Sequence, residues 1–264
     1  MSAGTVASGS LKFDVNLSIL LTDLPLLERP AAAAKAGFDA VELWWPFPAP
    51  DPGAADLAAL RQAIEDAGVR LVGLNFDAGD MAAGERGLLA RPDGSDRFRA
   101  NIDVAVRFAG ELGCGVLNAL YGNGPGTDHA LAVDNLRRAA DAAAGIGATV
   151  VVEALNSHEN PHYPITSSQA AFELIDEVDR DNVAFLADLY HLNRMGEDVL
   201  ALTDRHAARF GHVQIADDPG RGRPGSGRMP YAEIFARLEA AGYHGHVGLE
   251  YRHEGPGAFD WRQT

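Results

Sequence analysis

The chain has 264 residues and a formal net charge of −15. An acidic surface repels nucleic acid, because non-specific binding depends on Lys and Arg neutralising phosphates. No apolar run approaches the length needed to span a membrane, and the first residues lack the basic start and apolar core of a signal peptide. One cysteine, Cys114, excludes an internal disulfide and is expected to be a packing residue. The cytoplasm is therefore the expected location.

The order of predicted elements indicates a parallel α/β domain. Residues 1–10 are small and polar, so we expect a disordered tail. From residue 11 to 264, short apolar segments alternate with alanine-rich amphipathic ones. The expected strands are 13–17, 40–43, 71–75, 116–119, 149–153, 183–187, 212–215 and 247–250. The expected helices are 26–36, 55–67, 98–112, 130–144, 167–177, 199–208 and 231–241, with Ser167 or Ser168 as an N-cap.

Eight strands separated by seven helices predict a single closed (β/α)₈ barrel, the TIM-barrel architecture, rather than an open sheet. The length suits one such barrel, and no shift in composition marks a second domain. Residues 251–264 are too few for a full outer helix after the last strand.

Polar side chains follow four consecutive predicted strands. Three valines precede Glu153, and Asp188, Gln214 and Glu250 end the next three strands. Active sites of such barrels lie at the carboxyl ends of the strands, so these side chains are expected to converge. Clustered carboxylates raise one another's pKa unless a cation lies among them. An all-oxygen set without thiolate or imidazole favours Mg²⁺ or Mn²⁺ over zinc.

Each strand-end residue also has a simpler explanation. An acid there can cap a helix or pair with an arginine, and Gln214 is the least diagnostic because amides often bond loop backbone. The interpretation as a metal site depends on all four residues occurring at the carboxyl ends of consecutive strands.

Further polar residues are expected near the same end. His191 could donate to a substrate oxygen or bond loop backbone, and Glu159 could contact substrate or be solvated. Arg221, in a glycine-rich loop, suits capture of a carboxylate or hydroxyl but could also be solvated. Glu42 is expected to support a ligand rather than to be one, and His212 to be a core or supporting histidine.

Several segments resemble bacterial hydroxypyruvate isomerases, members of the xylose isomerase-like barrels that include ketose 3-epimerases and endonuclease IV. The similarity covers roughly residues 11 to 255. Its motifs are Val15-Asn16-Leu17-Ser18, Gly37-Phe38-Asp39-Ala40-Val41-Glu42, Gly79-Asp80-Met81-Ala82-Ala83-Gly84-Glu85-Arg86-Gly87, His212-Val213-Gln214-Ile215-Ala216-Asp217 and Gly248-Leu249-Glu250-Tyr251.

The resemblance implies one divalent metal ion held by Glu153, Asp188, Gln214 and Glu250, with Glu153 and Glu250 also transferring protons. It places His191, Arg221 and Glu159 against substrate. Arg221 is the expected partner of a substrate carboxylate, with Arg86 as the alternative. Arg228 and Arg252 replace the acid and the lysine usual in the family, and Pro161-His162-Tyr163 looks more like 2-oxotetronate isomerases.

The predicted function is metal-dependent isomerisation of hydroxypyruvate to tartronate semialdehyde through a cis-enediolate. A 2-oxotetronate isomerase and a ketose 3-epimerase are the enzymatic alternatives, and a sugar-acid binding protein is the non-enzymatic one. The charge and the few histidines disfavour a phosphodiesterase like endonuclease IV. The expected partner is a small hydroxy-oxo acid or sugar, and the oligomeric state, homo-oligomer or monomer, stays open.

Overall fold

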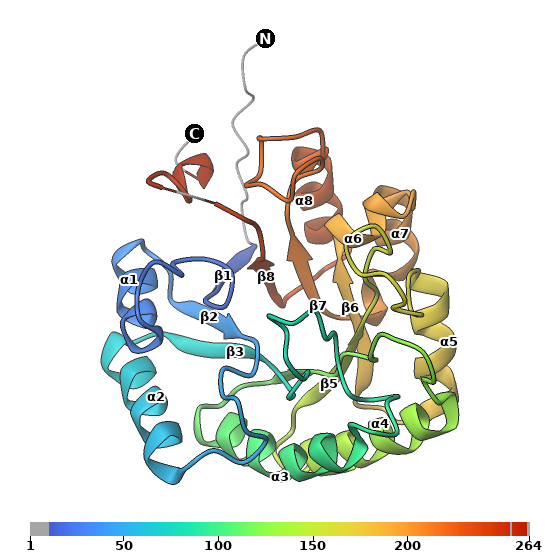
Figure 1. Ribbon diagram of the computed structural model, residues 1–264. Coiled ribbons are helices and arrows are strands. Elements are labelled where there is room, and N and C mark those ends of the chain that lie inside the picture. Colours follow the sequence, from blue (N-terminus) through green and yellow to red (C-terminus); the bar gives the residue numbers. More distant parts are fainter. Residues whose placement is uncertain (1–10, 254, 263–264) are drawn as a thin grey trace.

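The computed structural model describes residues 11–253 and 255–262, in which eight parallel strands close into a barrel in chain order (Figure 1). This confirms the predicted (β/α)₈ barrel, while the predicted tail 1–10 lies outside the described residues. The strands are β1 (Lys12–Asn16), β2 (Ala40–Leu43), β3 (Arg70–Asn75), β4 (Val116–Asn118), β5 (Thr149–Glu153), β6 (Val183–Asp188), β7 (Phe210–Ile215) and β8 (His246–Leu249).

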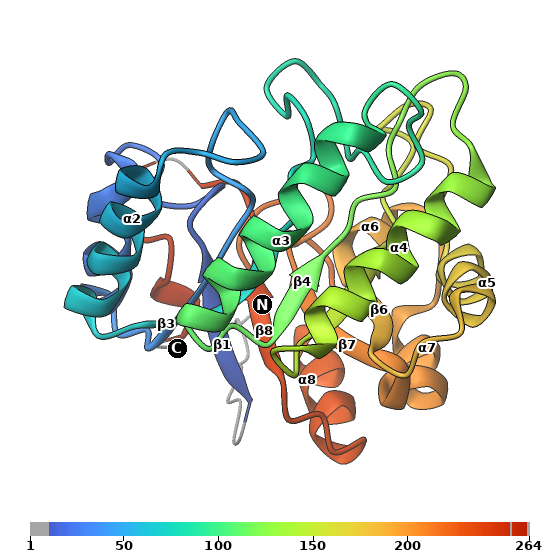
Figure 2. The same ribbon diagram turned by 90° about the horizontal axis from the view of Figure 1, so that it is seen from below.

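Helices ring the barrel on the outside, and α3 and α4 lie side by side across one flank (Figures 1 and 2). They are α1 (Arg29–Lys35), α2 (Ala54–Ala67), α3 (Ser95–Glu111), α4 (His129–Ala144), α5 (Ser168–Val178), α6 (Leu189–Arg194), α7 (Val199–His206) and α8 (Tyr231–Ala240), with 3₁₀ turns η1 (Leu26–Glu28), η2 (Ala207–Arg209) and η3 (Asp260–Arg262). No helix in the described ranges is long and apolar enough to cross a membrane.

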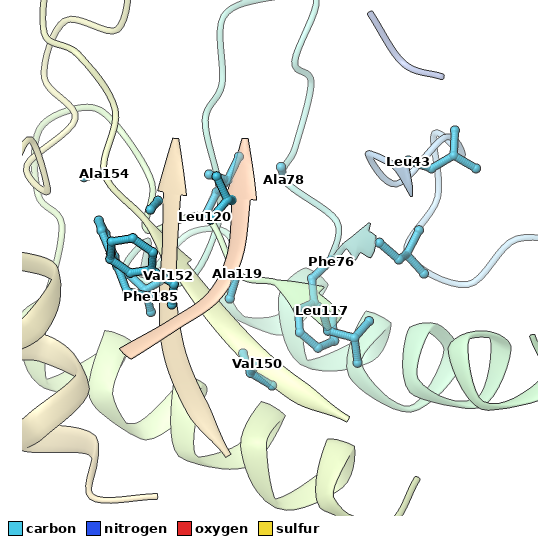
Figure 3. Packing of buried hydrophobic residues seen from close by; sticks show 14 of the residues in the cluster. Leu43, Phe76, Ala78, Leu117, Ala119, Leu120, Val150, Val152, Ala154 and Phe185 are labelled. Carbon is cyan, nitrogen blue, oxygen red and sulfur yellow. The ribbon is translucent and has the colours of Figure 1, made fainter. Parts of the chain in front are cut away.

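The main apolar core lies between strands and helices. Val150 and Val152 of β5 are fully buried in it (Figure 3). Phe185 of β6 packs edge-on against Phe172 of α5, with 5.1 Å between the ring centroids. Each such side chain contributes about 1.5–3 kcal/mol by leaving water. Because successive strand residues point to opposite faces, packing Val150 and Val152 outward turns Glu153 toward the barrel interior.

The helices differ from the predicted ones at two places. The sequence predicts no helix directly after β6, but the segment forms the short helix α6, because Asp188 Oδ1 accepts hydrogen bonds from the backbone N–H groups of Tyr190 and His191. Helix α3 begins at Ser95, earlier than predicted. The expected N-cap is confirmed at Ser167, whose Oγ accepts from the Ala170 N–H.

The barrel has no full helix after β8 among the described residues, as expected. The turn η3 takes that place, and its Trp261 packs edge-on against Phe13 of β1 at 5.6 Å. The turn therefore packs one aromatic side chain against β1.

Candidate active site

The strand-end acids converge inside the carboxyl end of the barrel. Glu153, Asp188, Glu250 and His191 of α6 each place one candidate ligand atom within 4.8 Å of the others, and all four are buried. Gln214 pairs in register with Asp188, and its Nε2 lies 3.4 Å from Glu250 Oε1. The four predicted metal ligands are thus neighbours; that they bind a metal stays a prediction.

A cavity of about 40 Å³ opens beside this cluster. His191, Arg221 and Arg86 line it, as the sequence suggested. Glu159 does not line it. The Glu159 carboxylate instead accepts from Asn156 Nδ2 at 3.1 Å and lies 3.8 Å from the Arg252 guanidinium. The remaining lining residues are Trp44, Asn75, Met81, Leu120, Glu153, Leu155, Asn160 and Glu250.

The two glutamates differ in their hydrogen bonds. Glu250 Oε1 accepts from Trp44 Nε1 at 2.9 Å and from Asn16 Nδ2 at 3.0 Å, and Oε2 contacts Arg221. Glu153 Oε2 accepts from Asn118 Nδ2 at 2.8 Å, while its Oε1 makes no hydrogen bond with the described residues. Glu153 therefore keeps one carboxylate oxygen without a donor among the described residues, whereas both oxygens of Glu250 have contacts.

Burial and mutual repulsion raise the pKa values of these acids. For Glu153, burial and then the Glu250 charge raise the pKa well above its usual range; for Asp188, the same two causes raise it to about 8. Two buried oxygens, Asp188 Oδ2 and Gln214 Oε1, have no hydrogen-bond partner among the described residues. Carboxylate and amide oxygens without donors suit a hard divalent cation, so the residues present fit such an ion.

Arg221 supplies positive charge to the cluster. Its guanidinium pairs with Glu250 Oε2 and lies 4.0 Å from Asp188 Oδ2, while its carbonyl accepts from the Arg252 N–H at 2.7 Å. The arginine pairing considered for a strand-end acid is therefore present at Glu250.

The hydrogen bonds of His191 define its tautomer. Its Nδ1 accepts from the Asn156 backbone N–H at 3.1 Å and lies 2.7 Å from Asn156 Nδ2. Burial, and then Arg221, lower its pKa well below the usual value, so the ring is neutral and carries its proton on Nε2. Nε2 lies 3.7 Å from Asp188 Oδ2. A neutral ring in this tautomer is a hydrogen-bond donor rather than a metal ligand.

Sequence reasoning missed the residues that hold the glutamates. Asn16 ends β1, Asn118 ends β4 and Trp44 follows β2 directly. Asparagines at strand ends meet the same positional criterion as the acids, so applying it to amides would have found two of the three. Nothing in the sequence distinguishes Trp44 from a packing residue.

The comparisons with known proteins agree with this geometry. A family model described as a xylose isomerase-like TIM barrel matches residues 30–264. A Streptomyces coelicolor protein named "Putative hydroxypyruvate isomerase" is 56% identical over 91% of this chain and 90% of its own. An Escherichia coli hydroxypyruvate isomerase is 34% identical over 92% of this chain and 93% of its own. A Pectobacterium atrosepticum 2-oxo-tetronate isomerase is 36% identical, also over 92% of this chain and 93% of its own.

Solved structures show the same architecture. A Brucella melitensis protein described as an AP endonuclease of family 2 superimposes with a TM-score of 0.85 at 37% identity, covering 93% of this chain and 94% of its own. A D-psicose 3-epimerase of Clostridium cellulolyticum gives a TM-score of 0.76 at 21% identity over 96% and 89%, which supports the fold alone. The closed barrel, the family model and the long, similar relatives agree, and the chain belongs to the xylose isomerase-like TIM barrel family.

Proposed function

We propose that this protein isomerises hydroxypyruvate to tartronate semialdehyde, using one Mg²⁺ or Mn²⁺ ion held by Glu153, Asp188, Gln214 and Glu250. The names of its similar relatives support the substrate class. The observation that carries the proposal is the pair of arginines facing one small cavity in a chain of net charge −15. An anionic substrate needs local cations to overcome that field.

The two arginines favour an acid over a neutral sugar. Arg86 and Arg221 line the same cavity, and burial followed by repulsion from Arg221 lowers the pKa of Arg86. A carboxylate between two guanidiniums relieves this repulsion and accepts charge-assisted hydrogen bonds. Neutral ketoses offer no such compensation.

The proton transfer falls to the carboxylates. A bound divalent cation would act as a Lewis acid that makes the proton next to the carbonyl removable. Glu153 takes that proton from C3 through its available Oε1, giving a cis-enediolate, and a carboxylate returns a proton to C2 while the proton of the 3-hydroxyl passes to the former carbonyl oxygen. His191 donates from Nε2 to a substrate oxygen. Apolar lining residues exclude water: Met81, Leu120 and Leu155.

Proton exchange tests the proposal directly. Metal-stripped protein re-supplied with Mg²⁺ or Mn²⁺ is followed by NMR in D₂O with hydroxypyruvate. We expect metal-dependent isomerisation with deuterium incorporated next to the carbonyl. A sugar-acid binding protein would show ligand-induced thermal shifts without exchange.

Two variants separate the roles of the glutamates. Glu153→Gln is expected to abolish deuterium exchange, while Glu250→Gln, which retains acceptors for Trp44 and Asn16, keeps the fold but loses most turnover. Near-wild-type exchange by Glu153→Gln would exclude it as the base.

A four-carbon acid is the second candidate. A larger hollow of about 550 Å³ adjoins the cavity and shares Trp44 and Met81 with it. That space favours a longer substrate such as 2-oxotetronate, on which several similar relatives are named to act. Comparing kcat/KM for the three- and four-carbon acids decides between them.

A further inference from the structure

A second cluster of titratable side chains lies deeper in the barrel. Asp14 lies two residues before Asn16 on β1, and His212 lies two residues before Gln214 on β7. Because residues two apart on a strand point to the same face, both side chains point inward, below the candidate active site. Asp14, Glu42 and His212 are buried, with one candidate ligand atom of each within 4.8 Å of the others. His212 Nε2 lies 2.7 Å from Glu42 Oε2 and 4.0 Å from Asp14 Oδ2.

Asp14 is the unusual member of this cluster. It is 0% exposed, and neither of its carboxylate oxygens has a hydrogen-bond partner among the described residues. Among the described residues, the nearby charges of Glu42 and Glu250 raise the pKa of Asp14 after burial, and that of His212 lowers it. One imidazolium cannot balance the two carboxylates of Asp14 and Glu42. A buried carboxylate in this state calls for a cation or a proton.

Glycines provide room for the polar side chains. A Cβ at Gly248 would lie 2.8 Å from Glu42 Oε1, and one at Gly73 would lie 3.2 Å from Glu42 Oε2. Barrel interiors of this class are usually filled by branched aliphatic side chains. The two glycines keep that space open for Glu42.

A separate cavity lies at the opposite end of the barrel. It measures about 230 Å³ and lies at the amino ends of the strands, where His212 and His246 line it. Four glycines contribute to its wall: Gly113, Gly115, Gly211 and Gly245. The cavity therefore borders His212 from the end of the barrel opposite the candidate active site.

We propose that Asp14, Glu42 and His212 form a second cation site, structural in role, that takes Zn²⁺. A divalent ion with a neutral imidazole balances both carboxylates. One nitrogen and two carboxylate oxygens form a donor set that zinc accepts, whereas the oxygens at the strand ends suit Mg²⁺ or Mn²⁺. Glu42 Oε1 accepts from Asn16 Nδ2 at 2.9 Å and from Gln214 Nε2 at 2.7 Å. An ion on Glu42 Oε2 would therefore hold Glu42 in place and, through it, the Asn16 and Gln214 side chains of the candidate active site.

Zinc content and anomalous diffraction test this site. Chelator-treated protein is dialysed against Zn²⁺ and its metal content measured by plasma mass spectrometry, and wild-type crystals grown with Zn²⁺ are measured at the zinc edge. We expect an anomalous peak between Asp14 and His212, and one zinc ion fewer per chain in Asp14→Asn. The matched control is Asp77→Asn, which alters another buried acid, bound by Arg97, and should retain the wild-type content.

A wild-type map without a peak at Asp14 overturns the proposal, as does unchanged zinc content in a folded Asp14→Asn variant. The map needs no variant, so a variant that fails to fold leaves the test intact. A peak at Glu153 and Asp188 concerns the proposed isomerase site separately, and its absence would not affect this inference.

Discussion

Replacing Arg86 by lysine probes how the substrate's carboxylate is recognised. Arg86 Nε donates to Asn160 Oδ1 at 2.9 Å, and Nη1 donates to the carbonyls of Met81 and Glu85 at 2.9 and 2.7 Å. Nη2 has no hydrogen bond to the described residues and is the nitrogen left for a ligand. One charge-assisted hydrogen bond is worth about 1.5–3 kcal/mol. Its loss predicts a KM for hydroxypyruvate about 10- to 100-fold higher.

Steady-state kinetics on hydroxypyruvate and on a neutral ketose provide the assay. Lysine keeps the charge but not the planar fork, so the acid should lose affinity while any turnover of the ketose changes little. Arg91→Lys is the control, because Arg91 bonds Glu85 and Asp93 and does not line the cavity. An unchanged KM for the acid, or equal losses on both substrates, would refute a carboxylate contact by Arg86.

Three further predictions concern stability and tautomer. Because burial and Glu250 raise the pKa of Asp188 from 3.8 to about 8, the folded metal-free protein holds a proton that the unfolded chain has released. Its free energy of unfolding should therefore fall between about pH 4 and 8, by up to about 1.4 kcal/mol per pH unit per proton, in urea titrations; a rise with pH would contradict this. Gly248→Ala should cost about 1–3 kcal/mol by crowding Glu42, whereas Gly115→Ala, with open space at its Cβ, should cost less. Asn156→Ala removes the side-chain contact to His191 Nδ1 but leaves the backbone N–H that donates to it, so ¹⁵N NMR spectra should still show the His191 proton on Nε2 while kcat falls about tenfold, the effect of one lost hydrogen bond; a proton found on Nδ1 would count against the assigned tautomer.

Hydrophobic periodicity is a local property, and it identified every strand of the barrel. The run of valines before Glu153 and the repeated strand-end acids were readable because strand and helix periods are set within a few residues. Helix α6 escaped because its signal is a single cap: Asp188 looks the same in sequence whether its side chain bonds backbone or a ligand. In the structure Asp188 Oδ1 accepts from backbone N–H groups, and Asp188 Oδ2 has no hydrogen-bond partner among the described residues.

The sequence by itself therefore determined the barrel, its strand order and which acids end consecutive strands. Only the tertiary structure decided which oxygens are already satisfied, because those hydrogen bonds join residues far apart in the chain. Asn16 reaches Glu250, Asn118 reaches Glu153, and Glu42 lies between Gln214 and His212. Closing the barrel brings β1 beside β8, so Asn16 can donate to Glu250. Glu250 therefore has partners on both carboxylate oxygens, whereas Glu153 keeps one oxygen without a donor among the described residues.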